Sequence, residues 1–452
     1  MKAIVVGGTA AGLSAASKAK RIEPEIEFKV YERSGFTSYG ACGLPYLIED
    51  RVKKPEDLVT LTPQALTNKR GIPTFIRHEV KHLDAAAKKV VVENLDTGER
   101  FEERYDKLVL ATGSSALLPP IWGIEARDVY VLKTVEDAVA IKAKARQSKK
   151  AIILGGGPIG LETADALRGC GMEVEVVEVQ PRLLPFFEEE YSSQVAGALK
   201  DRGVGLHVGL SVQEVIAPNG RFTACRLSND HVLDADFLLV CAGVRPNTEL
   251  AKEAGLELGA RGAIRVDERM RTSDPDIYAC GDCATVHNAL TGKETYIPLG
   301  TTANKQGRVA GANLAGRNAA FGGVIGAQVV KVFDLFLAAC GMNLAEAKAE
   351  GYDANSVRIQ KGSIANYYPG GSANTITLVF DKKDGRLLGA QGSGDDSIAG
   401  RMNVFVVAVT MGMTVEQING LDLVYTPSVA PVYDPILIAA AQAVKKVSGT
   451  DD

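Results

Sequence analysis

One cysteine lies in a setting that suits redox chemistry. Cys42 belongs to the run SYGACGLPY (residues 38–46), one glycine before a predicted helix start. A helix N-terminus favours the thiolate, which is the nucleophilic form of cysteine. We therefore expect Cys42 to be a reactive thiol, the alternative being a small buried residue. The other six cysteines are scattered and the total of seven is odd, which argues against a disulfide framework and fits a reducing compartment.

A glycine-rich turn in the middle of the chain could hold a dinucleotide. The turn GGGPIG (155–160) follows an apolar strand and opens a predicted helix. Its glycines allow a tight turn, a close backbone approach to the pyrophosphate and close packing of helix on strand, and the helix N-terminus favours the phosphate charge. The residues expected to contact the cofactor here are Gly155, Gly157, Pro158, Ile159, Gly160 and Glu178.

Glu178 ends the next predicted strand, 18 residues after Gly160. A carboxylate in this position accepts hydrogen bonds from a ribose 2′-OH and repels a 2′-phosphate. The sequence therefore favours NADH, with NADPH as the alternative.

A second turn of this kind opens the chain. It departs from the ideal pattern because Thr9 occupies the middle glycine position, but Glu32 again closes the following strand, 20 residues after Gly12. Two further strand exits suit a nucleotide. Gly281-Asp282 follows residues 277–279 and can present a carboxylate to a ribityl chain, and Ala111-Thr112-Gly113 makes a tight turn after an apolar strand. The expected contacts are Gly7, Gly8, Ala10, Ala11, Gly12, Glu32, Arg33, Ala111, Thr112, Gly113, Gly281 and Asp282.

The elements that must position these residues form two similar units. Residues 3–33 and 151–179 each read as buried strand, glycine turn, helix and second strand, which predicts two βαβ units with parallel sheets. From about residue 325 the pattern changes to apolar strands (375–380) and a helix (398–412). With 452 residues the chain is too long for one core, since cores stop growing at roughly 250–300 residues.

The composition of the chain argues against several classes of binding partner. The net charge is −4 and no basic run occurs, which argues against nucleic-acid or anionic-membrane partners. No segment reaches the roughly 18 apolar residues of a membrane span. Residues 1–17 imitate a secretory signal, but the glycine spacing favours a nucleotide unit, and we expect a cytoplasmic protein. The five histidines form no cluster and Cys280-x-x-Cys283 lacks a second ligand pair, so no metal site is expected.

The order GGTAAG…E, ATG, GGGPIGLE…E and YACGDCA resembles the pyridine-nucleotide disulfide oxidoreductases over essentially the whole chain. The resemblance implies an α/β fold with two Rossmann-like domains, glutathione reductase-like, and a C-terminal α+β dimerisation domain. It implies FAD in residues 1–115 and 243–325, NAD(P)H in residues 116–242, and dimerisation through residues 326–452. It also assigns Gly243 and Ala303 to the cofactor sites.

The pattern Ser-x-x-x-Cys-Gly-Leu-Pro-Tyr is similar to the single-cysteine branch, because Leu47 stands where other members carry a second cysteine. That branch reduces coenzyme A disulfide or persulfide and polysulfide, or, as NADH oxidases and peroxidases, oxygen or peroxide. Oxidases and peroxidases carry a histidine where this chain has Ala10, which favours sulfur substrates. An NADH oxidase, or an electron donor to a redox carrier protein, remains the alternative.

The resemblance also implies that Tyr367 and Tyr425 reach across a homodimer to the partner's cysteine and assist the leaving thiolate; the alternative is two packing tyrosines. It implies contacts to coenzyme A, for which the alternative on the first helix is a solvated face. Asn304 replaces a histidine, and Tyr433 stands where a basic residue occurs in relatives. The expected contacts are Ser14, Lys18, Arg21, Ser38, Arg70 and Asn304.

Overall fold

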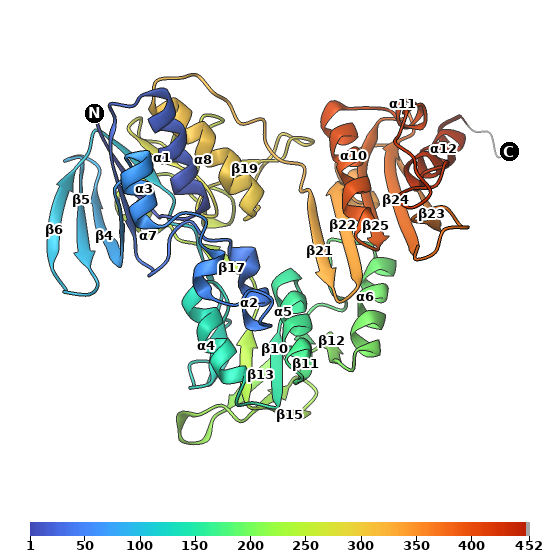
Figure 1. Ribbon diagram of the computed structural model, residues 1–452, viewed down its shortest axis with the longest axis horizontal. Helices are drawn as coiled ribbons and strands as arrows, with labels where there is room; N and C mark the ends of the chain where they lie inside the picture. Colours follow the sequence, from blue (N-terminus) through green and yellow to red (C-terminus); the bar gives the residue numbers. More distant parts are fainter. Residues whose placement is uncertain (449–452) are drawn as a thin grey trace.

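The computed structural model describes residues 1–448 and shows three parts, each built on its own five-stranded sheet (Figure 1). The first sheet is parallel throughout. Most residues of its strands are buried, as expected for a parallel sheet covered on both faces. In spatial order they are β18 (Ile277–Ala279), β7 (Lys107–Leu110), β1 (Lys2–Val6), β2 (Glu27–Glu32) and β3 (Thr74–Ile76).

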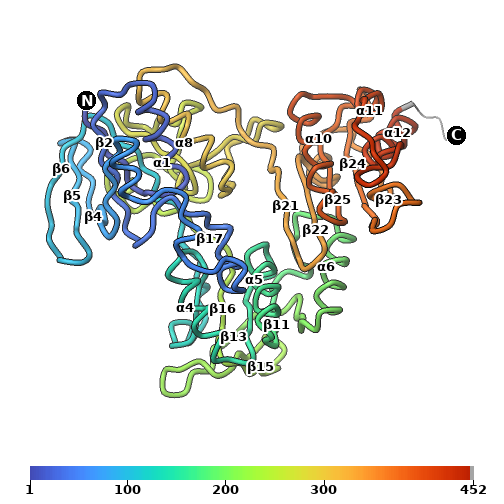
Figure 2. The backbone as a smooth tube through the Cα atoms, viewed as in Figure 1, coloured from blue at the N-terminus to red at the C-terminus, as the bar shows by residue number. Residues whose placement is uncertain are grey.

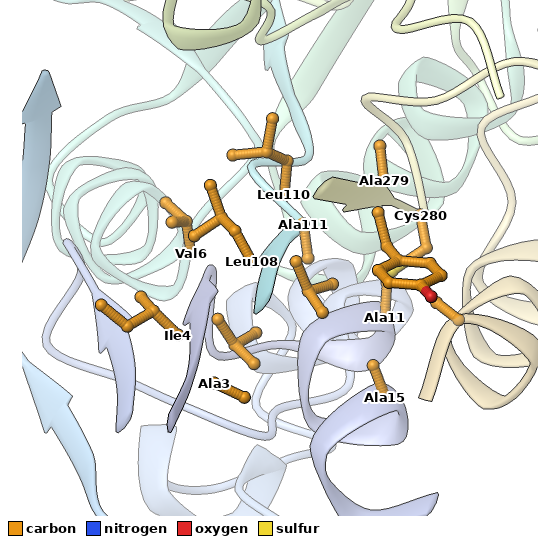
Figure 3. Close-up of a cluster of buried hydrophobic side chains, with 14 of the residues drawn as sticks. Ala3, Ile4, Val6, Ala11, Ala15, Leu108, Leu110, Ala111, Ala279 and Cys280 are labelled. Atoms are coloured by element: carbon orange, nitrogen blue, oxygen red, sulfur yellow. The ribbon is translucent and has the colours of Figure 1, made fainter. Parts of the chain in front are cut away.

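Two helices from distant parts of the chain lie side by side on this sheet: α1 (Ala10–Ile22) in blue and α8 (Gly300–Leu314) in yellow (Figure 2). Figure 3 shows Ala11 and Ala15 of α1 in one buried cluster with strand residues such as Leu108. The helices touch through backbone, because a Cβ on Gly307 would lie 2.3 Å from the Ala11 carbonyl oxygen, and a Cβ on Gly311 would lie 2.1 Å from that of Ala15.

The second sheet is also parallel and completes the second βαβ unit. Three helices accompany it: α4 (Val135–Ala145), α5 (Pro158–Gly169) and α6 (Glu189–Asp201). Its strands are β12 (Gly205–Val208), β11 (Glu173–Glu178), β10 (Lys150–Leu154), β16 (Phe237–Val240) and β9 (Val129–Val131).

Smaller sheets flank these two units. They are β4 (His78–Asp84), β5 (Lys89–Asn94) and β6 (Arg100–Arg104); β13 (Val212–Ile216), β14 (Ala224–Leu227) and β15 (Val232–Asp234); β8 (Ser114–Ala116) with β17 (Val244–Pro246); and β19 (Val286–His287) with β20 (Glu294–Thr295). Short helices complete the first part: α2 (Leu44–Ile48), α3 (Pro63–Arg70) and α7 (Glu249–Glu253).

The third part is an antiparallel sheet on which two helices, α10 (Ser397–Met411) and α12 (Pro435–Ser448), pack. The short helices α9 (Leu344–Ala349) and α11 (Val415–Asn419) connect its elements. Its strands are β21 (Gln328–Val332), β22 (Leu335–Gly341), β25 (Leu387–Gly394), β24 (Ala373–Asp381) and β23 (Ala354–Gly362).

The predicted α/β class is confirmed, with two parallel Rossmann-like sheets followed by an α+β part. The strand ends predicted at Glu32 and Glu178 and the helix predicted near residues 398–412 are also confirmed. Within residues 1–448, no helix combines the length and apolar character that crossing a membrane requires.

Candidate active site

The two glycine turns are stabilised by the same pair of hydrogen bonds. The Glu32 carboxylate accepts the Gly8 N–H at 2.7 Å and the Ser34 N–H at 2.8 Å. The Glu178 carboxylate accepts the Gly156 and Gln180 N–H groups, both at 2.7 Å. Each carboxylate oxygen takes one N–H and keeps a lone pair, so both groups can still accept a bond from a ribose hydroxyl.

The backbone of both turns fits a bound dinucleotide. Gly7 and Gly155 have φ of +110° and +118°, a region open mainly to glycine, and each would drive a Cβ into a carbonyl oxygen. Gly157 differs, because a Cβ there would meet no protein atom within 4 Å. Protein packing therefore does not explain this glycine, whereas close approach of a pyrophosphate does.

The strand exits lie close to these turns. Ala111 is against Gly7, Thr112 is bonded through its hydroxyl to the Asn247 carbonyl at 2.6 Å, and Gly113 has φ of +69°. Gly243 has φ of +104°, and Gly281, with φ of +82°, lies against Ala11 and Ala303. Of the remaining expected contacts, Ala10 and Pro158 begin helices α1 and α5, Ile159 is exposed on α5, and Arg33 is exposed after β2.

Asp282 is the centre of a polar cluster that the sequence did not reveal. Its carboxylate accepts a hydrogen bond from the Ser114 hydroxyl at 2.9 Å and forms an ion pair with the Lys133 ammonium at 3.2 Å. The same ammonium donates to the Ser114 oxygen at 2.8 Å, and the Tyr296 hydroxyl donates to the Asp282 carbonyl at 2.9 Å. Lys133 carries no motif signal, and only the fold brings it to Asp282.

Cys42 lies in a single helical turn (Ala41–Gly43) that leads into α2. The residue is exposed in the single chain, yet enough protein surrounds the sulfur that burial raises the pKa of the Cys42 thiol, as do the charges of Glu162 and Asp282. Lys133 acts in the opposite direction. The lowering of the thiol pKa expected from a helix N-terminus is therefore outweighed, first by burial of the sulfur and then by the nearby acidic groups.

Helix α2 is anchored in the core of the second unit, where Leu44 and Leu47 pack with Leu161 of α5 and with Val330 of β21. All three parts of the chain thus meet behind Cys42. Ser38, four residues before the cysteine, adopts a strained φ of +52°, and its N–H donates to the Gly8 carbonyl at 2.9 Å. This bond ties the cysteine segment to the first glycine turn.

Glu162 on α5 is a second residue that the sequence did not single out. Burial raises its pKa to about 7, while the backbone N–H and the ammonium of Lys331 on β21 oppose that rise. Its neighbour Asp165 accepts hydrogen bonds from the Lys331 ammonium at 3.1 Å and the Phe333 N–H at 3.2 Å. The sequence feature that could have pointed to Glu162 is its position two residues after Gly160, on the helix that packs against α2 of the cysteine segment.

Four of the residues expected to contact coenzyme A lie on the paired helices α1 and α8. The Ser14 hydroxyl donates to the Asn304 side-chain oxygen on α8 at 2.7 Å. Lys18 and Arg21 follow on the same helix, and Arg70 ends α3 beside Lys20, whose side chain lies 3.2 Å from the position of a Cβ on Gly71. Across residues 1–448 neither Lys18 nor Arg70 forms an ion pair, which leaves both cations available to an anionic ligand.

Tyr367 and Tyr425 form a pair. Their hydroxyl groups lie 3.1 Å apart, both side chains are exposed, and the bond from Tyr367 raises the pKa of Tyr425. Tyr367 lies between β23 and β24, which Figure 1 shows at the side of the molecule away from α2. A single chain therefore does not bring the tyrosines to its own Cys42.

The Cys280-x-x-Cys283 pair is less suited to thiol chemistry than Cys42. Cys280 and Cys283 are fully buried, and burial raises the pKa of both thiols. All seven cysteines are free. In the part of the chain that the structure describes, no group of three histidine, cysteine or acidic side chains is arranged to hold a metal ion.

Comparison with known proteins adds family context. Residues 1–307 match the family described as pyridine nucleotide-disulphide oxidoreductase, and residues 327–434 match its dimerisation domain. The chain is 34% identical to an NADH oxidase of Methanocaldococcus jannaschii over 99% of this chain and 100% of that protein. It is 34% identical to an NAD(P)H coenzyme A polysulfide/persulfide reductase of Pyrococcus horikoshii over 97% of each. An NAD-dependent persulfide reductase from A. fulgidus matches in structure with a TM-score of 0.95 and 37% identity, over 99% of this chain and 84% of that one.

Proposed function

The chain belongs to the pyridine nucleotide-disulphide oxidoreductase family, whose members are FAD-dependent NAD(P)H oxidoreductases, and we propose that it reduces a disulfide or persulfide of coenzyme A through Cys42. One observation carries the proposal. Cys42 is a free, exposed thiol within electrostatic reach of Asp282 and Lys133, and the position of a second cysteine is filled by Leu47. A lone thiol must form its mixed disulfide with the substrate.

In the proposed reaction the Cys42 thiolate attacks one sulfur of the substrate, forms a new S–S bond and releases the other sulfur as a thiol or sulfide. Two electrons and a proton then regenerate Cys42 and free coenzyme A. FAD, when held by the first glycine turn and the Asp282 segment, would supply the two-electron transfer between nicotinamide and sulfur. Overall, one disulfide, NADH and a proton give two thiols and NAD⁺, and a persulfide gives a thiol and hydrogen sulfide.

The charges around Cys42 determine how readily this thiol ionises. Lys133 is the cation that lowers the thiol pKa, and it competes with the raising effect of burial, Glu162 and Asp282. Its role in the proposed reaction is to stabilise the thiolate while Asp282 anchors its ammonium at 3.2 Å.

The partner subunit completes the site in this proposal. Tyr367 and Tyr425 are exposed and bonded to one another, and they belong to the dimerisation domain. We propose that the pair of one subunit approaches Cys42 of the other and donates a hydrogen bond or proton to the departing thiolate. The same chemistry explains why two phenols are kept at an exposed position.

The cations on α1 and α3, which form no ion pair within residues 1–448, support a coenzyme A substrate. Coenzyme A carries several phosphates, and Lys18, Arg21 and Arg70 offer charge to them. The carboxylate of Glu178 favours NADH as the reductant. The seven free thiols suit a reducing, cytoplasmic setting.

An NADH oxidase is the second candidate function, because the M. jannaschii relative carries that name. Ala10 weighs against it, since this position offers no imidazole to deliver protons to a reduced oxygen species.

The test is anaerobic NADH consumption with three acceptors: coenzyme A disulfide, coenzyme A persulfide and a small disulfide that lacks the nucleotide. We expect turnover of a coenzyme A species with a low KM. Replacing Lys18 and Arg21 together by alanine should raise that KM about tenfold or more and leave the small disulfide unaffected. Failure of every sulfur acceptor, with NADH consumption restored by air, would move the oxidase to first place.

A further inference from the structure

Two surface loops carry the tyrosine pair. The first tyrosine loop, residues 363–372, connects β23 to β24 and contains Tyr367. The second tyrosine loop, residues 420–434, connects α11 to α12 and contains Tyr425. Since the loops come from distant parts of the sequence, something must hold them in register before the two hydroxyl groups can meet at 3.1 Å.

A buried arginine joins the bases of both loops. Arg401 on α10 is 6% exposed, and its guanidinium donates to the carbonyl of Ser363, the first residue of the first tyrosine loop, at 2.7 Å. The same group pairs with the carboxylate of Asp434, the last residue of the second tyrosine loop, at 2.9–3.2 Å. The fork geometry of guanidinium lets one side chain bind two such groups at once.

We call the contacts of Arg401 with Ser363 and Asp434 the arginine clamp, and neighbouring polar groups extend it. Arg401 also donates to the Asn374 side-chain oxygen at 2.9 Å and to the Ser397 hydroxyl at 2.6 Å. Ser397 and Asn374 in turn bond to Asp395, which accepts the hydroxyl of Ser372, the last residue of the first tyrosine loop, at 2.8 Å. Although burial acts in the other direction, hydrogen bonds from this serine and asparagine set lower the pKa of Asp395 to about 2, so it stays ionised.

The loops are bridged again between base and tip. The Ala365 N–H donates to the Pro427 carbonyl at 3.1 Å, and the neck of the first tyrosine loop is closed by the Ser363 N–H bonded to the Ser372 carbonyl at 2.7 Å. The two loops are therefore joined at three levels: by Arg401 at their bases, by the Ala365–Pro427 bond above it, and by the two hydroxyl groups.

We infer that Arg401 is a positioning residue for catalysis, which acts through the two loops to hold Tyr367 and Tyr425 as one proton-donating pair. The inference rests on the proposed function, because it needs the tyrosines to serve the sulfur reaction. A buried ion pair is costly to desolvate, and packing alone would be met as well by apolar side chains. The placement of its acceptors at both loop bases is what points to positioning.

The test uses the holoenzyme dimer and the variant Arg401→Met/Asp434→Asn. This variant removes both buried charges together and keeps an acceptor for the Ile436 N–H at the start of α12. We expect kcat with coenzyme A disulfide or coenzyme A persulfide as acceptor to fall about 100-fold, since a misplaced catalytic group costs rate of that order. Reduction of ferricyanide by NADH, which bypasses sulfur chemistry, should stay within about twofold of the parent.

A double-mutant cycle separates positioning from mere structure. In the Tyr367→Phe/Tyr425→Phe background, loss of the arginine clamp should lower sulfur turnover no further, because nothing remains to be positioned. Losses that multiply, or a parallel fall in ferricyanide reduction and in dimer content, would overturn the inference. If the double phenylalanine variant turns over sulfur normally, the role proposed for the tyrosines fails, and the positioning role fails with it.

A single, milder substitution tests the same inference should the double variant fail to fold. Ser372→Ala frees the neck of the first tyrosine loop from Asp395 without touching a buried charge, and it should lower sulfur turnover about tenfold with ferricyanide reduction intact. The matched control is Lys382→Met/Asp353→Asn, which removes an ion pair of 3.5 Å at the opposite end of β23 and β24 and should change neither reaction. Equal rates for Ser372→Ala and this control would contradict the inference.

Discussion

At the scale of single residues, the charge of Glu162 affects the ionisation of the Cys42 thiol. Its carboxyl contributes to the raised pKa of Cys42, it sits on α5 behind the cysteine segment, and its own pKa is about 7. A group with this pKa changes charge in the range where cells operate, so its ionisation changes the environment of the thiol.

The first prediction concerns stability. The pKa of Glu162 rises from its ordinary 4.5 to about 7, so the folded protein keeps a proton that the unfolded chain releases in between. The free energy of unfolding therefore falls as pH rises through this window. The free energy of unfolding of Glu162→Gln should equal that of the parent near pH 5 and exceed it near pH 8, by at most about 3 kcal/mol. Urea unfolding at both pH values measures the difference, and equal stabilities at pH 8 would contradict the assignment.

The second prediction concerns the thiol. Since ionised Glu162 raises the pKa of Cys42, Glu162→Gln should shift the pH midpoint of Cys42 alkylation by iodoacetamide to a lower value. Cys170→Ala serves as the background in both proteins, because Cys170 is also exposed. An unchanged or higher midpoint would show that Glu162 does not govern the thiol.

At the scale of elements, the contact of α1 with α8 fixes the first nucleotide turn. The third prediction is that Gly311→Ala forces these helices apart, since its Cβ would lie 2.1 Å from the Ala15 carbonyl oxygen. We expect a loss of about 1–3 kcal/mol and weaker retention of FAD, measured by thermal unfolding and flavin release. Gly197→Ala on α6 meets no atom within 4 Å and should be neutral or slightly stabilising. Equal behaviour of the two variants would contradict this view of the helix contact.

The elements also show what the sequence could and could not reveal. The glycine turns, Glu32 and Glu178 were predictable because strand, turn and helix are adjacent in sequence, and their chemistry is local. Lys133, Glu162 and Arg401 act through contacts made by folding, across separations such as 149 residues for Lys133 and Asp282. The raised pKa of the Cys42 thiol could not be predicted, because the burial of its sulfur and the nearby acidic groups both arise from tertiary structure.

At the scale of the whole molecule, Cys42 and the tyrosine pair belong to different parts of one chain. The proposed site is complete only in a dimer, in which one subunit supplies Cys42 and the other supplies the tyrosine pair. Within each chain, α5 packs against both α2 and β21, so it links the cysteine segment to the dimerisation domain.

The fourth prediction tests this exchange. A heterodimer of one Cys42→Ser subunit and one Tyr367→Phe/Tyr425→Phe subunit holds one intact site only if the tyrosines act across the interface. It should show about one half of the parent turnover with the sulfur acceptor, since one of two symmetric sites survives. Each parental homodimer serves as a control with strongly reduced sulfur turnover. A heterodimer no more active than the two homodimers would contradict action across the interface.

The most direct test of the central claim is anaerobic NADH consumption by the parent and by Cys42→Ser, with coenzyme A disulfide or persulfide as acceptor. We predict rapid turnover by the parent and a loss of roughly a thousandfold or more in Cys42→Ser, which should still bind FAD and reduce ferricyanide. Unchanged sulfur turnover in Cys42→Ser would contradict the account, since the chemistry would not then pass through this thiol.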